Sequence, residues 1–486
     1  MTIFRPVLLI SHALLLAACA GTPATRSVQA PLPAEWQVPL PHQGRLANLS
    51  GWWREQGDPL LPELIAAAQS QSPTLAAARS RIEQARAART AAAAALLPNL
   101  DAMASLARSN AQPPLPMGTT TQGALQSAWE IDLFGGNRAT RTAAESRLQG
   151  AQAAWHEARV SVAAEVASQY YGLRTCEQLL SVAESDAASR TETARLTQLS
   201  ADAGFQAPAT AALARASAAE ARGRLMQQRA ACEIDIKALV ALTGIDEPQL
   251  RQRLAAAPAP LDPVPLAIDR LPARLLTQRP DLYAAENEVA AASVEIDSAE
   301  AQRYPRLTLN GSVGLANFRG GGMDTDLNTW SIGPLALTLP LFDGGRRAAN
   351  VELAKVRYEE AVINYRARVR QAVREVEQAL VTLASIAQRR EDALLAVQGY
   401  RASYDATESR YRNGLASLIE LEETRRARLA SENTLATLDL EHRNAWISLY
   451  RAAGGGWSRD DVAPVAEASE TTETAQTTST AHAVNE

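Results

Sequence analysis

The chain has 486 residues, of which 47% are hydrophobic but only 5% aromatic, and its formal net charge is −5. A chain of this length could form roughly two to four domains of ordinary size. Much of its apolar content is alanine, which favours helices but buries little surface. We therefore expect long helices packed in a thin layer. The weak negative charge gives no reason to expect a nucleic-acid partner.

The first 18 residues are typical of a secretory signal peptide. The apolar run at residues 7–18 follows a basic residue and is shorter than the roughly 20 residues of a membrane-spanning helix. It ends in Leu-Ala-Ala-Cys, which matches the bacterial lipoprotein motif. We expect residues 19–59 to form a lipid anchor, acylated at Cys19, and an N-terminal linker; the alternative is an ordinary buried cysteine. Ala20 follows, and by resemblance to lipoprotein sorting this indicates the outer membrane.

Landmarks recur along the chain in the same order. Pro73 is repeated at Pro280 with an offset of 207, and Gly204 at Gly414 with an offset of 210. The motif Leu-Phe-Gly-Gly that contains Phe134 is repeated as Leu-Phe-Asp-Gly-Gly. We therefore predict an internal tandem duplication. Its parts are a first repeat at residues 60–245, a linker at 246–271, a second repeat at 272–457 and a disordered tail at 458–486.

Each repeat is predicted to contain an entry helix, two strands and a long helical hairpin. Strands are indicated by apolar residues at every second position, and the loop between them by Pro, Gly and Thr. The predicted strand pairs are 99–109 with 123–133, joined by a loop at 112–121, and 306–316 with 330–341, joined by a loop at 318–328. The long helices, residues 136–204 and 345–414, contain no proline and would each extend roughly 100 Å. Shorter helices at 208–243 and 417–453 return from them.

No other stretch of the chain reaches 18 consecutive apolar residues, so strands would have to carry any insertion into a bilayer. Strands of about 10 residues suffice when tilted; the alternative is a short soluble hairpin with one wet face. Four strands cannot close a barrel, because at least eight are needed and open edges cannot face lipid. The chain must therefore form oligomers, and three copies would supply twelve strands. We predict an α+β membrane protein, a lipid-anchored oligomeric barrel continued by a helical tube long enough to cross much of a periplasm.

Several motifs then resemble one family over nearly the whole mature chain. These are Trp52-Trp53 with Asp58-Pro59-Leu60, the Phe-Gly-Gly turns at Phe134 and Phe342, and Tyr411-Arg412-Asn413-Gly414. They are similar to the outer-membrane factors of TolC and OprM type, especially the lipoprotein branch. The resemblance implies a homotrimer, with a 12-stranded transmembrane β-barrel made of four strands per chain and continued by a long periplasmic α-helical barrel. This homotrimer passively exports substrates. These are delivered by an inner-membrane pump through a periplasmic adaptor.

The resemblance also assigns roles to the ends of the two helical hairpins. Contacts with the adaptor are expected from Gly204, Phe205, Gln206, Tyr411, Gly414, Leu415 and Ala416, although each glycine could simply permit a left-handed turn. A periplasmic gate is expected from Glu420 and Glu423, which share a helical face. The alternative is surface pairing with Arg425, Arg426 and Arg428. The first hairpin has Pro208 and Thr210 where the family can have an acidic residue.

Two cysteines are placed symmetrically about the first hairpin turn. Cys176 precedes Gly204 by 28 residues and Cys232 follows it by 28, so the two would lie level with each other. The periplasm is oxidising, which allows a disulfide. Packed helices, however, stand 8–10 Å apart, whereas a disulfide needs Cα atoms within about 7 Å. Two buried thiols therefore remain the alternative.

No motif for chemistry stands out. The five histidines are scattered, and no zinc spacing, nucleophile elbow or phosphate loop is present. We expect neither an enzyme nor a cofactor. The leading hypothesis is the outer-membrane channel of a tripartite efflux pump for small molecules such as drugs. The alternatives are a type I secretion duct for proteins and a non-conducting structural lipoprotein of the periplasm.

Overall fold

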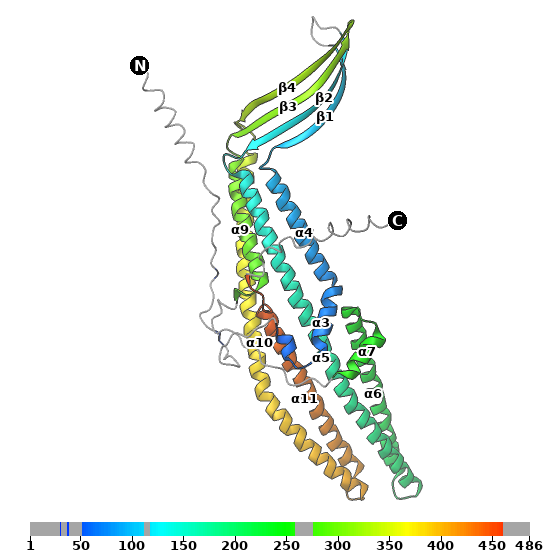
Figure 1. The fold of residues 1–486 in the computed structure, drawn as a ribbon. Coiled ribbons are helices and arrows are strands. Elements are labelled where there is room, and N and C mark those ends of the chain that lie inside the picture. Colours follow the sequence, from blue (N-terminus) through cyan, green and yellow to red (C-terminus); the bar gives the residue numbers. More distant parts are fainter. Residues whose placement is uncertain (1–29, 31–35, 38–50, 111–116, 258–275, 460–486) are drawn as a thin grey trace, which may run out of the picture.

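The computed structural model describes residues 30, 36–37, 51–110, 117–257 and 276–459. Both halves have the same order of elements: helix, two strands, long helix, return helix (Figure 1). The first half contains α2 (Trp52–Glu55), α3 (Leu60–Gln71), α4 (Pro73–Ala94), β1 (Asn99–Ser109), β2 (Gly118–Ile131), α5 (Gly136–Asp202) and α6 (Pro208–Thr243). The second half contains α9 (Pro280–Ala301), β3 (Arg306–Gly320), β4 (Met323–Thr338), α10 (Arg346–Arg412) and α11 (Leu418–Ala452). The expected signal peptide and Cys19, the expected acylation site, lie outside the described residues.

Corresponding helices of the two halves match in length. α5 and α10 both have 67 residues, and α4 and α9 both have 22. Positions in α4 therefore correspond to positions in α9 at an offset of 207, and positions in α5 to positions in α10 at 210. The predicted linker is not entirely irregular, because it contains the helix α7 (Glu247–Ala256).

The helices form one layer rather than a bundle around a central core. α5 packs against α4 and α6 on one side and against α9 and α11 on the other, and α10 packs against α9 and α11. The outer members of the layer are thus α4 and α6 at one side and α10 at the other (Figure 1). None of the described helices is long and apolar enough to cross a membrane.

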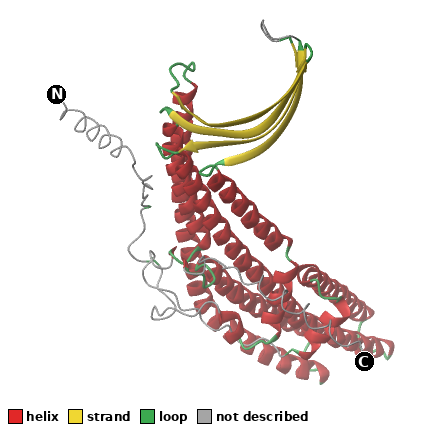
Figure 2. Cartoon of the chain, turned by 45° about the horizontal axis from the view of Figure 1, so that its top comes forward, coloured by secondary structure: helices red, strands yellow, loops and turns green. Residues whose placement is uncertain are grey.

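The strands form a single curved antiparallel sheet in the order β1-β2-β3-β4 (Figure 2). The central pair, β2 and β3, joins the two halves of the chain. Both β1 and β4 have one side without a partner strand among the described residues. The sheet is therefore open at both edges in one copy.

The two faces of the sheet differ in polarity. Residues directly opposite each other on paired strands point to the same face, and successive residues point to opposite faces. One row across the four strands is Ala102, Leu125, Val313 and Trp330, and the adjacent row is Asp101, Gln126, Ser312 and Ser331. One face is therefore mainly apolar and the other mainly polar, as the alternation in the sequence predicts.

The strands extend further than expected. β2 begins at Gly118, inside the expected loop at residues 112–121. The expected loop at residues 318–328 is wrong, because β3 continues to Gly320 and β4 starts at Met323. Gly321 and Gly322 both have positive φ values, 59° and 85°, and turn the chain tightly between them. Glycine tolerates such values without steric cost.

The largest buried hydrophobic cluster lies near the middle of the helical layer and contains Trp52 and Trp53, which accounts for this pair of neighbouring tryptophans. Trp52 stacks on Tyr450 with ring centroids 5.2 Å apart, so the start of the first half packs on the end of the second. The buried Tyr170 hydroxyl donates to Asp58 Oδ2 at 2.5 Å, while Asp58 Oδ1 accepts from the Leu60 amide at 3.0 Å. Burial raises the pKa of the Tyr170 phenol above its usual value.

Cys176 on α5 and Cys232 on α6 are joined by a disulfide, with their Cα atoms 5.5 Å apart. The general spacing of packed helices favours two separate thiols, but the observed distance between these Cα atoms is smaller than that spacing. Four of the eight buried side chains of α6 are alanines, and small residues allow two helices to approach closely. The disulfide therefore fastens the first helical hairpin well away from its turn.

Candidate channel entrance

Both helical hairpins turn through a glycine in the left-handed conformation. Gly204 has a φ of 80° and Gly414 a φ of 76°. The amide of the following residue donates back to the helix: Phe205 N to Ser200 O, and Leu415 N to Arg410 O, both at 2.8 Å. This is the Schellman arrangement for ending a helix. The glycines are therefore required by the turns, whatever else they contact.

The residues expected at the adaptor contact divide into two groups. Gly204, Phe205, Gln206, Gly414 and Leu415 are exposed, and Phe205 retains 84% of its accessible surface. Tyr411 and Ala416 are half-buried. The Tyr411 hydroxyl lies 2.8 Å from Thr197 Oγ1 on α5, so Tyr411 joins the two hairpins within one chain.

Gly414→Ala is expected to destabilise the protein by roughly 1–2 kcal/mol, the cost of a left-handed conformation for an L-residue. A Cβ added at Gly414 meets no atom within 4 Å, so the effect reports backbone conformation alone. Gly399→Ala is the matched control, because Gly399 is helical and equally open. That variant should be stabilised by roughly 0.5–1 kcal/mol. Shifts of the same sign in thermal denaturation would contradict this account.

Glu420 and Glu423 both lie near the start of α11. The Glu420 amide donates to the Ser417 side chain at 3.1 Å, which caps the helix. The Glu420 carboxylate pairs with Arg410 on α10, with Arg410 Nη1 2.7 Å from Glu420 Oε1. Glu423 is exposed, lines the groove between α6 and α11, and has no ion-pair partner among the described residues. The expected alternative, pairing of either glutamate with Arg425, Arg426 or Arg428, is absent from the described part of the chain.

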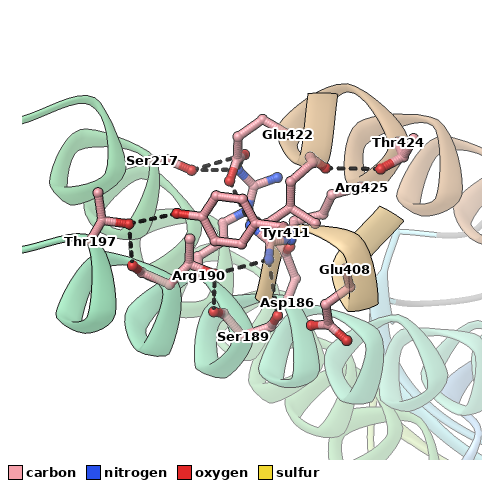
Figure 3. A network of polar contacts seen from close by, with 12 residues as sticks. Asp186, Ser189, Arg190, Thr197, Ser217, Glu408, Tyr411, Glu422, Thr424 and Arg425 are labelled. Carbon is pink, nitrogen blue, oxygen red and sulfur yellow. Dashed lines mark hydrogen bonds and ion pairs between the residues drawn. The ribbon is translucent and has the colours of Figure 1, made fainter. Parts of the chain in front are cut away.

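A buried ionic network that the sequence did not indicate joins α5, α6 and α11 near the start of α11 (Figure 3). Arg190 on α5 donates through Nε to both oxygens of Asp186 at 2.9 and 3.0 Å. Its Nη1 donates to Ser217 Oγ on α6 at 2.5 Å and also to Glu422 Oε2 on α11. One arginine thus connects three helices from both hairpins.

Arg425 extends this network from the α11 side. Its side chain has no accessible surface, and its Nη1 donates to Glu422 Oε1 at 2.5 Å. Its Nη2 donates to Ser189 Oγ and Thr193 Oγ1 on α5 at 3.1 and 3.2 Å. Glu422 therefore accepts from two buried arginines, Arg190 and Arg425, and completes a chain of alternating charges with Asp186. Burying a pair of opposite charges is costly, but removing one charge of a buried pair strongly destabilises the protein.

The sequence did not reveal this network, because the bonds that join the two hairpins connect residues more than 200 positions apart. The local signal was present: Asp186 with Arg190 has i,i+4 spacing and Glu422 with Arg425 has i,i+3 spacing. Both pairs resemble ordinary surface pairs on solvated helices. No group of three metal-ligating side chains occurs within the described ranges.

Known proteins resemble this chain over almost its whole length. The sequence profile described as outer membrane efflux protein matches residues 64–245 and 271–455, once in each half. The pyoverdine export outer membrane protein OpmQ of Pseudomonas putida is 30% identical over 473 residues, which cover 95% of this chain and 99% of OpmQ. The solvent efflux pump outer membrane protein SrpC of Pseudomonas putida is 28% identical, with 92% and 97% covered.

Solved structures agree with this assignment. The outer-membrane channel OprN superposes with a TM-score of 0.81 at 27% identity, covering 90% of this chain and 100% of OprN. The outer membrane protein VceC of Vibrio cholerae gives a TM-score of 0.73 at 26% identity, covering 85% and 100%. The resemblance found in the motifs is confirmed, and the chain belongs to the outer membrane efflux protein family.

Proposed function

We propose that this outer-membrane efflux protein is a passive duct built from three copies of the chain. The observation that carries the proposal is the sheet with one apolar and one polar face and two unpaired edges. Unpaired backbone groups cannot face lipid, so β4 of one copy must pair with β1 of another. Three copies supply twelve strands, which exceeds the minimum of eight for a transmembrane barrel. The tandem duplication then makes a wall of six similar units.

The helical layer continues the wall into the periplasm. A helix of 67 residues extends roughly 100 Å at 1.5 Å per residue. Because the layer is one helix thick and its outer members α4, α6 and α10 lack helical partners on one side within the described ranges, closing it into a ring produces a hollow tube. We also propose that Cys19 is acylated and anchors the chain in the outer membrane. The exposed tips of the helical hairpins would then contact a periplasmic adaptor.

The proposed cargo is small organic molecules handed over by an inner-membrane pump. Relatives are named for the export of solvents, toluene and pyoverdine, which differ greatly in polarity. We infer that the duct itself selects weakly and that selection resides in the pump. The alternatives, protein secretion and a non-conducting scaffold, have no comparable support among these relatives, and a scaffold has no need of a two-faced sheet.

The gate is proposed to depend mainly on Glu423. Arg410 already balances the charge of Glu420, whereas the Glu423 carboxylate is exposed and unpaired among the described side chains. In planar bilayers, purified protein is expected to give conducting channels that prefer cations. Glu423→Gln should reduce this preference, measured as the reversal potential in a salt gradient, more than the matched control Glu420→Gln. Insertion without conductance would overturn the duct, while equal shifts would overturn only the role of Glu423.

A further inference from the structure

We propose that the acidic C-terminal tail, residues 460–486, docks in a basic trough between α4 and α5 of its own chain. The sequence predicts disorder for this tail, which lies outside the described residues. The trough is a cavity of about 590 Å³, and its lining includes Leu75, Arg79 and Ile82 on α4 and Trp155, His156 and Arg159 on α5. This docking involves one chain and does not depend on how many copies assemble.

The trough carries positive charge that the described chain does not neutralise. Arg79 and Arg159 have no carboxylate partner among the described side chains. A second cavity, of about 630 Å³, adjoins the trough at Arg159 and adds Arg54, which is likewise without an acidic partner in the described ranges. Glu83, the acidic side chain that lines the trough, is already paired with Arg86. The surface therefore attracts anions.

The tail and the trough have complementary patterns. Large apolar and basic side chains alternate along the wall that α4 contributes, in the order Leu75, Arg79, Ile82 and Arg86. The tail begins with two acids, continues with an apolar stretch and returns to an acid, at Asp460, Asp461, Val462–Ala466 and Glu467. The whole tail holds six acidic residues and no lysine or arginine. Docking therefore pairs its acids with the arginines and its valines with the apolar side chains.

The described chain ends beside the trough. The ring centroid of Trp457 lies 6.4 Å from that of His156, and Arg459, the last described residue, donates to Glu286 Oε2 on α9 at 2.7 Å. α5 lies between α9 and α4 in the layer (Figure 1), so two helix spacings, about 20 Å, separate this end from the trough. Extended chain as far as Glu467 spans up to about 26 Å. The acids of the tail can therefore reach the arginines.

The internal repeat shows how the chain end covers the corresponding surface of the second half. There the C-terminal segment lies on α9, where Arg459 pairs with Glu286 and stands 5.1 Å from the ring centroid of Tyr283. At the offset of 207, Glu286 corresponds to Arg79 on α4. The charge at the repeated position is thus reversed. The second half accepts a basic segment here, and the first half favours an acidic one.

Carbodiimide crosslinking of the purified full chain tests this docking. Arg79→Lys places an amine in the trough, and the reagent joins an amine to a carboxylate only where the two groups touch. Arg81→Lys is the matched control, because Arg81 is also exposed on α4 but two positions away, on another face of the helix. Mass spectrometry should find at least about tenfold more linkage to residues 460–486 in Arg79→Lys, since docking raises the local concentration of carboxylates.

Two results of the crosslinking would overturn the proposal. Equal linkage in the two variants would show that the tail does not favour the trough. Linkage that doubles the mass of the chain on a denaturing gel would assign the tail of another copy and exclude docking within one chain.

A peptide added in trans provides the second test. In the full chain, replacing the six acids of the tail by the corresponding amides should free the trough, so that a labelled peptide of residues 460–486 binds in fluorescence anisotropy. The chain with its natural tail should bind this peptide at least about tenfold more weakly, because its own tethered tail competes. In the amide background, Arg79→Glu should weaken binding more than about tenfold and Arg81→Glu less than about twofold.

A scrambled peptide of the same composition separates the tail from acidic partners in general. It keeps the charge but moves Val462 and Val465 away from their flanking acids, and it should bind at least about fivefold more weakly because the apolar contacts are lost. Equal affinity of the two peptides would show a surface for any anionic partner and overturn the assignment to the tail. Absence of binding to the amide variant would overturn the trough itself.

Discussion

Glu422→Gln is expected to loosen the attachment of the second helical hairpin to the first by roughly 3–5 kcal/mol. The change keeps the size of the side chain but removes the negative charge that Arg190 and Arg425 share. Both arginines would remain buried, with only Asp186 left to balance them. Because the hairpins touch mainly through α5 and α11, this loss acts directly on the entrance.

Native-state hydrogen exchange followed by mass spectrometry measures this effect. Amides of α11 that face α5 should exchange roughly a hundred to several thousand times faster, which is the factor for 3–5 kcal/mol at 1.4 kcal/mol per tenfold. Glu423→Gln is the matched control, because it removes the adjacent but exposed carboxylate and should change stability by less than about 0.5 kcal/mol. Equal protection in the two variants would show that the network does not hold the hairpins together.

The same network distinguishes the two kinds of contact around the proposed ring. At an offset of 210, Arg190 corresponds to Tyr400, Asp186 to Ala396 and Glu422 to Ala212. The seam between copies therefore lacks the buried acids that fasten the hairpins within one chain. If the contact between copies follows the repeat, contacts that hold buried acid–arginine pairs alternate around the proposed entrance with contacts that lack these acids. We infer that the entrance yields first at the seams between copies.

Local periodicity and the residues that end helices or form turns were enough to predict the elements that repeat. Gly204 and Gly414 mark the hairpin turns, and alternation marks the strands, because each of these signals acts over a few residues. The offsets of 207 and 210 then required two similar halves. The short turn between β3 and β4 was missed because Gly320, Gly321 and Gly322 are common in both tight turns and long loops.

Contacts between distant residues could not be predicted in this way. Nothing near Glu422 indicates that it meets Arg190, and Tyr411 was expected only at the adaptor, although its hydroxyl lies beside Thr197. Equal distances from Gly204 placed Cys176 and Cys232 level but did not reveal how closely α5 and α6 approach. That approach depends on the small residues between the helices, which only the packed structure displays.

Removing the disulfide with Cys176→Ala/Cys232→Ala is expected to destabilise the first helical hairpin selectively. The two cysteines are 56 positions apart, and closing a loop of that length is worth about 4 kcal/mol in the chain-entropy account. The second hairpin provides an internal comparison, because the positions 28 residues on either side of Gly414 are Ile386 and His442. Hydrogen exchange should therefore accelerate in α6 and remain unchanged in α11.

Reduction of the unaltered protein is the matched control, since it breaks the same disulfide bond but leaves both cysteine side chains in place. Both treatments should accelerate exchange in α6 to a similar extent. If only the double alanine variant does so, the loss comes from packing around Cys176 and Cys232, which are both buried. If α6 and α11 respond equally, the disulfide supports the whole layer. Its position between α5 and α6 instead predicts that the first hairpin stays rigid, whereas the second depends on packing and on noncovalent polar contacts such as the Arg410–Glu420 pair and the Glu422 network.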